Sequence, residues 1–153
     1  MTALRRVKNP QDKVGGGSDL EDPELDEAEF EEPGEVYVDW AIEDLNRLRG
    51  SYLDLIEGEG VESENIEDIH RVAGDIAGQG GNYNFPLMSK VAGLLKTFVK
   101  DRTELNDLGR EVVRLHFEAL QTVINAKIVG DGGAAGKEVL AGLEKVIKKV
   151  SKI

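Results

Sequence analysis

The stretch TELNDLGREVVRLHFEALQTVINA, residues 103–126, decides the fold class, because its apolar residues recur every three or four positions. That spacing is typical of one face of an amphipathic α-helix. The stripe consists of Leu105, Leu108, Val112, Leu115, Ala119, Val123 and Ala126. Thr103 is placed to cap the first turn, and the glycine-rich run that begins at Gly130 ends the segment. The stretch therefore predicts one long helix with a single apolar face.

The same spacing appears in four other segments, near residues 35–58, 63–78, 84–98 and 134–150. Ser63 can cap the second of them, and Pro86 suits the first turn of the third. The only run with a strand-like period of two is the short Val36-Tyr37-Val38 stretch. The sequence therefore predicts an all-α protein, an antiparallel four-helix bundle with an extra C-terminal helix, over residues 35–153.

The segment before the first helix has a different composition. Residues 1–34 hold 4 basic and 10 acidic side chains, and eight of the acids lie between Glu21 and Glu32. Such a segment buries too little apolar surface to offset the entropy lost on ordering. We expect a disordered acidic tail that carries no chemistry of its own.

Composition also limits the function. The chain has no cysteine and two histidines, which argues against thiolate metal sites and against a histidine-rich metal centre. The net charge of -11 is unfavourable for neutralising phosphates, so we expect no nucleic-acid partner. No apolar run is long enough for a membrane span. These observations favour a soluble cytoplasmic protein with no cofactor, no metal and no membrane partner.

The segment Gly74-Asp75-Ile76-Ala77-Gly78-Gln79-Gly80-Gly81, continued by Phe85-Pro86-Leu87, is the most specific motif of the chain. It resembles the active helix and following turn of bacterial histidine phosphotransfer domains, whose pattern is His-Asp-Ile-Lys-Gly-Gln-Gly-Gly followed by an aromatic-Pro-Leu start. Weaker similarity extends the match to about residues 36–150. The resemblance implies a helical bundle that exchanges a phosphoryl group between the receiver domains of response regulators, or with a histidine kinase.

The resemblance also shows what is missing. Gly74 stands where the family has the phosphoacceptor histidine, and Ala77 stands where it has a charge-offsetting lysine. Gly78, which in the family leaves room for the docking receiver, is present. The resemblance therefore implies a degenerate, non-enzymatic phosphotransfer module that binds a receiver or a kinase, with a monomer favoured. The docking surface that it predicts consists of His70, Arg71, Gly74, Asp75, Ala77, Gly78, Gln79, Gly81 and Asn82.

Two alternatives stay open at the level of sequence. His70 lies four residues before Gly74, on the same stripe of the helix, and could be a displaced phosphoacceptor with Arg71 beside it. The chain could also be a bundle that only scaffolds or dimerises. The second histidine, His116, has no partner at helical spacing to complete a metal pair, so we expect a hydrogen-bonded structural role.

Overall fold

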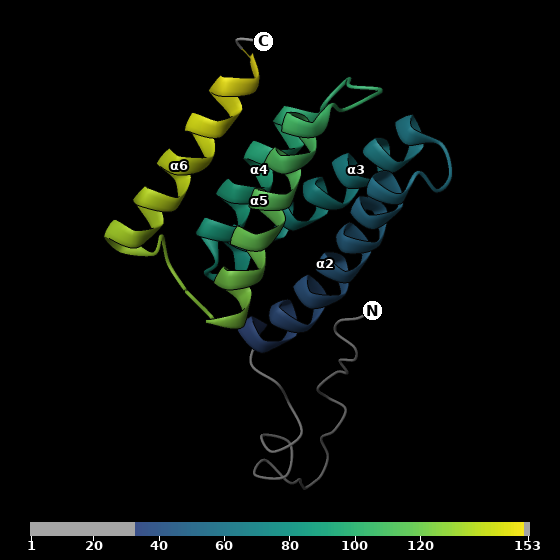
Figure 1. Ribbon diagram of the computed structural model, residues 1–153. Helices are drawn as coiled ribbons and strands as arrows, with labels where there is room; N and C mark the ends of the chain where they lie inside the picture. The colour runs from purple at the N-terminus through teal and green to yellow at the C-terminus, as the bar shows by residue number, and fades with distance from the viewer. Residues whose placement is uncertain (1–32, 152–153) are drawn as a thin grey trace, which may run out of the picture. The chain divides into compact units, whose positions relative to one another are not determined.

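The computed structural model describes residues 33–151, and all its regular structure is helical (Figure 1). Its elements are α2 (Pro33–Glu57), α3 (Glu62–Gly80), the short 3-10 helix η1 (Gly81–Tyr83), α4 (Pro86–Val99), α5 (Asp107–Asn125) and α6 (Gly133–Ser151). The all-α prediction is therefore confirmed over this range. The predicted acidic tail lies outside the described residues, apart from Pro33 and Gly34, which begin α2.

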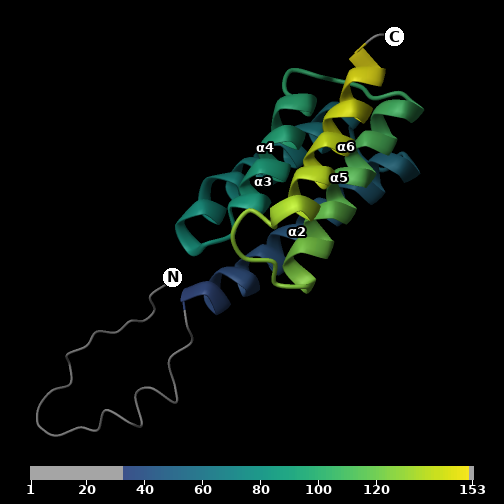
Figure 2. The same ribbon diagram turned by 90° about the vertical axis from the view of Figure 1, so that its left-hand side faces the viewer.

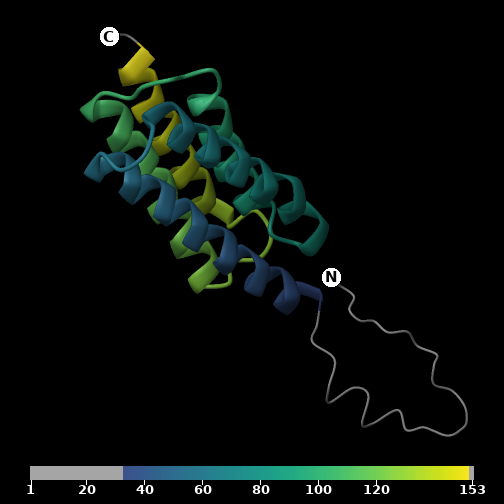
Figure 3. The ribbon, with the colours of Figure 1, turned by 90° about the vertical axis from the view of Figure 1, so that its right-hand side faces the viewer.

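Helix α2 contributes a continuous apolar face to the core. Its buried residues are Tyr37, Val38, Ala41, Leu45, Leu48 and Leu55. The alternating Val36-Tyr37-Val38 stretch is helical here, because its two buried members belong to this face. The Tyr37 ring stacks on Tyr83 and Phe85, with ring centroids 5.5 Å and 5.2 Å away. Figure 3 shows α2 alongside α3.

The corner between α3 and α4 depends on a close approach of backbone at Gly80. The Phe85 N–H donates to the Gly80 carbonyl oxygen (2.8 Å), and Asn84 takes a left-handed conformation with φ 68°. Pro86 then begins α4, as predicted. A Cβ atom on Gly80 would lie 2.6 Å from the Phe85 carbonyl oxygen, so only glycine fits without a shift of the chain.

Two predicted caps are wrong. Helix α3 begins at Glu62 after Val61, so Ser63 lies inside its first turn. Helix α5 is capped by Asn106, whose side-chain oxygen accepts the Gly109 N–H at 2.8 Å, and Thr103 lies before it in the loop. Both Thr103 and Asn106 are residue types that cap helices, and Asn106 is the one followed directly by the helical residues.

The buried face of α5 differs from the predicted stripe. The helix buries Gly109, Val112, Val113, His116, Leu120, Val123 and Ile124. Leu108, Leu115 and Ala119 of the predicted stripe are only half-buried, and Ala126 is exposed. The core face is therefore rotated by about one residue, and His116 lies at its centre with no exposed surface.

Helix α6 packs against α4 and α5 and lies on their far side from α2 (Figures 1 and 2). The loop before it turns through Gly130, Gly132 and Gly133, which all have positive φ. The Gly130 N–H donates to the Asn84 carbonyl oxygen (2.9 Å), which ties this loop to the α3–α4 corner. Within residues 33–151, none of the helices combines the length and the apolar composition that crossing a bilayer requires.

Candidate functional site

The predicted docking residues all lie at the surface of α3 and of the turn that follows it. His70, Gly74 and Ala77 are half-buried, and the remaining six are exposed. The opposite face of α3 supplies the core through Ile66, Ile69, Val72, Ala73 and Ile76. The helical period thus separates a solvent face from a core face on α3, and the solvent face is the one that can meet a partner.

A surface groove of about 470 Å³ is centred on Gly74. It is lined from α3 by Glu67, His70, Arg71, Gly74 and Asp75, and from α4 by Lys96. Four of the predicted docking residues therefore meet in this groove. The remaining five, Ala77, Gly78, Gln79, Gly81 and Asn82, lie beyond it along α3 and the turn, outside its lining.

Lys96 is not among the site residues predicted from the sequence. Its side chain crosses over Gly74, so that a Cβ atom on Gly74 would lie 3.6 Å from Lys96 Cδ and Cε and 3.8 Å from Nζ. These are ordinary van der Waals distances, so a Cβ atom at Gly74 is accommodated beside the lysine. The groove therefore contains a cation from the neighbouring helix, although Ala77 supplies none. The spacing of residues in α3 could not predict the presence of Lys96 in the groove. Lys96 reaches the groove because α3 packs against α4.

His70 is held in a way that matters for the displaced-acceptor alternative. Its Nε2 atom is shielded from solvent and has no hydrogen-bond partner among the described residues. A nucleophilic imidazole nitrogen must reach the phosphorus of an incoming aspartyl phosphate. In this conformation Nε2 is covered, so the side chain must rotate before this nitrogen can act as an acceptor. Arg71, its neighbour, is paired with Asp68 at 2.9 Å across one turn of the helix.

The glycines of the Gly78-Gln79-Gly80-Gly81 block serve different purposes. A Cβ atom on Gly78 or Gly81 would meet nothing within 4 Å, so both leave the outer surface open. Gly80 instead faces the start of α4 and would collide with Phe85 and Ser89. The Gly81 N–H donates to Ser89 Oγ at 3.0 Å, which further fixes the turn. Part of the motif therefore shapes the corner, and part shapes the surface.

His116 is fully buried and hydrogen-bonded, as fits the structural role that was expected of it. Its Nδ1 lies 2.7 Å from the Val112 carbonyl oxygen, to which it donates as a neutral ring. Burial lowers the pKa of His116, and the hydrogen bond to Val112 opposes this shift only in part. Among residues 33–151, no three histidine or acidic side chains are grouped so that they could hold a metal ion.

Comparison of the chain with protein-family models, with curated proteins and with solved structures finds no match in any of the three. The candidate site therefore stands on its residues and their geometry.

Proposed function

We propose that the chain is a histidine phosphotransfer-like module that binds the receiver domain of a response regulator, or a histidine kinase, without carrying a phosphoryl group. It acts by occupying a surface of its partner and is not an enzyme. The proposal includes the finer architecture: α2, α3, α4 and α5 form an antiparallel four-helix bundle, and α6 is the additional C-terminal helix. It also includes a monomeric state and a cytoplasmic location.

The observation that carries this proposal is the groove at Gly74. The resemblance assigns a phosphoacceptor to the position of Gly74. At this position the surface of α3 carries a groove. Glycine has no side-chain nucleophile, so no bond to phosphorus can form. A surface groove at the position that the resemblance assigns to the acceptor, without the acceptor itself, supports docking without phosphoryl transfer.

A second observation supports docking as the retained activity. No side chain stands above Gly78 or Gly81, and Ala77, which directly precedes Gly78, is small and half-buried. A partner can therefore approach the α3 backbone closely along this stripe. Protein interfaces gain most of their affinity from a few well-packed central contacts, which such a surface permits.

The proposal is tested by titrating a panel of receiver domains with the protein and with its Gly78→Leu variant. We expect at least one receiver to bind, and the leucine to weaken that binding at least tenfold because it fills the approach to α3. Gly142→Leu is the matched control, since Gly142 is an exposed glycine of α6 whose Cβ would also meet nothing within 4 Å. Equal affinities for Gly78→Leu and Gly142→Leu would contradict docking on this face.

The same panel, used in its phosphorylated form, separates the alternatives. An acid-labile phosphoryl on His70 that is lost in His70→Ala would identify an active carrier and replace the proposal. The shielded Nε2 of His70 speaks against that outcome. Self-association tighter than binding to any receiver would instead identify a dimerising scaffold.

A further inference from the structure

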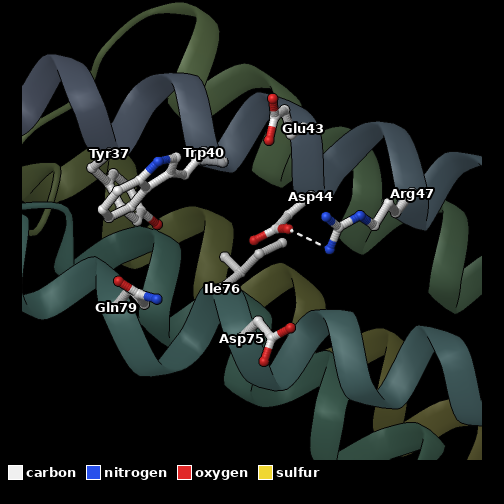
Figure 4. Close-up of a pocket in the computed structure, with 9 residues that line it drawn as sticks. Tyr37, Trp40, Glu43, Asp44, Arg47, Asp75, Ile76 and Gln79 are labelled. Atoms are coloured by element: carbon white, nitrogen blue, oxygen red, sulfur yellow. Dashed lines mark hydrogen bonds and ion pairs between the residues drawn. The ribbon is translucent and has the colours of Figure 1, made fainter. Parts of the chain in front are cut away.

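A second pocket, separate from the groove at Gly74, lies between α2 and α3 and encloses about 370 Å³ (Figure 4). Its α2 wall contains Tyr37, Trp40 and Asp44, and its α3 wall contains Asp75 and Gln79. The docking surface uses Asp75 and Gln79 but none of the α2 residues. The α2 residues of the pocket therefore have no role in the proposed docking surface.

The aromatic end of the pocket holds a buried hydroxyl without a partner. Tyr37 is 2% exposed, and its hydroxyl makes no hydrogen bond to the described residues. Figure 4 shows this hydroxyl directed from α2 toward α3, on the side of Gln79. Stacking on Tyr83 and Phe85 keeps the ring in place, and Trp40 meets Tyr83 edge to face at 5.9 Å. A buried tyrosine hydroxyl normally has a partner, so this one is suited to a polar group of a ligand.

The rest of the pocket carries excess negative charge. Three carboxylates, on Glu43, Asp44 and Asp75, line it together with a single cation, Arg47. Arg47 pairs with Asp44 at 3.3 Å, and no hydrogen bond or ion pair from the described residues reaches Glu43 or Asp75. Burial raises the pKa of Asp44, Arg47 counteracts this, and the charges of Asp75 and Glu43 add to the rise. A positive group in the pocket would relieve this repulsion.

The chemistry of the lining selects the kind of cation. The three carboxylates are not gathered into a group that could hold a metal ion. A planar cation with several N–H groups can instead donate to more than one acceptor of the lining at once. The indole of Trp40 at one end offers a face over which such a cation is favourably placed. The Arg47 guanidinium already occupies one side of the pocket and shows that this group fits beside Asp44.

We propose that the α2–α3 pocket binds a guanidinium group, which donates to Asp75 and to the Tyr37 hydroxyl oxygen and lies against Trp40. The group can belong to a free guanidine compound or to an arginine side chain of a peptide. The argument for this pocket does not rest on the proposed function, although Asp75 and Gln79 also belong to the predicted docking surface.

Trp40 provides the measurement, because it is the only tryptophan in the chain. The full-length protein is titrated with methylguanidinium at constant ionic strength, and the tryptophan fluorescence is recorded. We expect a saturable change for the wild-type protein. Asp75→Asn should weaken binding by about two- to fivefold, as expected for loss of one exposed ion pair. Tyr37→Phe should weaken it at least about threefold, through loss of one hydrogen bond.

The controls make the result decisive. Asp54→Asn removes an exposed α2 carboxylate outside the pocket and should leave the affinity unchanged. A peptide with one arginine, compared with its norleucine analogue, identifies the source. Tighter binding of the arginine peptide than of methylguanidinium indicates a side-chain ligand, and the reverse order indicates a free compound. A linear fluorescence change, an equal response to Mg²⁺, or equal affinities for Asp75→Asn and Asp54→Asn would overturn the proposal.

Discussion

The two faces of α3 use the same residue type for opposite purposes. Gly78 faces outward, and a side chain there would meet nothing within 4 Å. Gly80, only two residues later, faces inward, where a Cβ would lie 2.6 Å from a backbone oxygen of the α4 start. One glycine leaves room for another molecule, and the other leaves room for the chain itself. A glycine-rich motif can therefore support a binding surface and a fold at once, and substitutions separate the two contributions.

The largest effect is expected on the outer face, from Gly74→His combined with Ala77→Lys. This double variant restores both groups that the resemblance assigns to phosphoryl acceptance, and a Cβ at Gly74 fits beside Lys96. We expect acid-labile phosphoryl on the new histidine after incubation with a phosphorylated receiver, where the wild-type protein acquires none. Mass analysis of the modified peptide locates it.

The control for this variant is Gly74→Ala combined with Ala77→Lys, which adds the lysine without a nucleophile. A double variant that binds the receiver and acquires no phosphoryl would show that Gly74 does not occupy the acceptor position.

On the inner face, Gly80→Ala should destabilise the fold. The new methyl group would press on the Phe85 carbonyl oxygen and on Ser89, whose backbone nitrogen lies 3.0 Å from the Cβ position. Overpacking of this kind costs about 1–3 kcal/mol. Urea unfolding followed by circular dichroism measures the loss, and an unchanged midpoint would contradict the close approach at this corner.

The pH dependence of stability examines the core around His116. Because burial lowers the pKa of His116, the unfolded chain takes up a proton at a higher pH than the folded protein does. The free energy of unfolding should therefore fall as pH drops below about 6.5, the usual histidine value, by up to about 1.4 kcal/mol per pH unit. The fall ends below the lowered pKa of the folded state.

His116→Gln removes this titration while keeping a donor for Val112. Unfolding curves between about pH 7.5 and about pH 5.5, roughly one unit on either side of the usual histidine pKa, should show a flatter profile for the variant. The carboxylates of Glu62 and Glu111, whose pKa values are lowered by hydrogen bonds to Leu105 and Arg114, affect stability only at lower pH. Identical profiles for the two proteins would show that His116 titrates normally.

The smallest effect is expected for Gly78→Ala. Alanine is the better helix former, and the space above Gly78 is open, so the variant should gain about 0.5 kcal/mol of stability. The same urea experiment measures it. Stabilisation by Gly78→Ala together with destabilisation by Gly80→Ala would confirm the contrast between the two faces. A loss of stability in both variants would contradict it.

Most of the fold could be predicted because apolar spacing reports helices directly. All five segments chosen on this basis are helical. The predicted face of α5 differs from the observed one because apolar spacing selects Leu115 and Ala119 and does not select a polar residue such as His116. The hydrogen bond from His116 to Val112 satisfies one ring nitrogen within the helix, which makes burial of this polar side chain possible. Hydropathy alone does not contain that information.

The candidate site was only partly predictable. The surface positions of His70, Gly74 and Gly78 follow from the period of a single helix, and the structure has them there. Lys96 and the α2–α3 pocket depend on contacts between helices. The spacing of residues within one helix says nothing about how that helix packs on its neighbours. It therefore could not predict that Lys96 lies over Gly74, or that Tyr37 and Asp75 line the same pocket.

Asp75 lines both the groove at Gly74 and the pocket between α2 and α3. Two ligands that share one carboxylate are heterotropic effectors of each other. If a guanidinium compound engages Asp75 and changes the affinity for a receiver by some factor, thermodynamic linkage requires the receiver to change the affinity for that compound by the same factor. The concentration of a small cation that binds Asp75 would then determine how much of the receiver the protein binds.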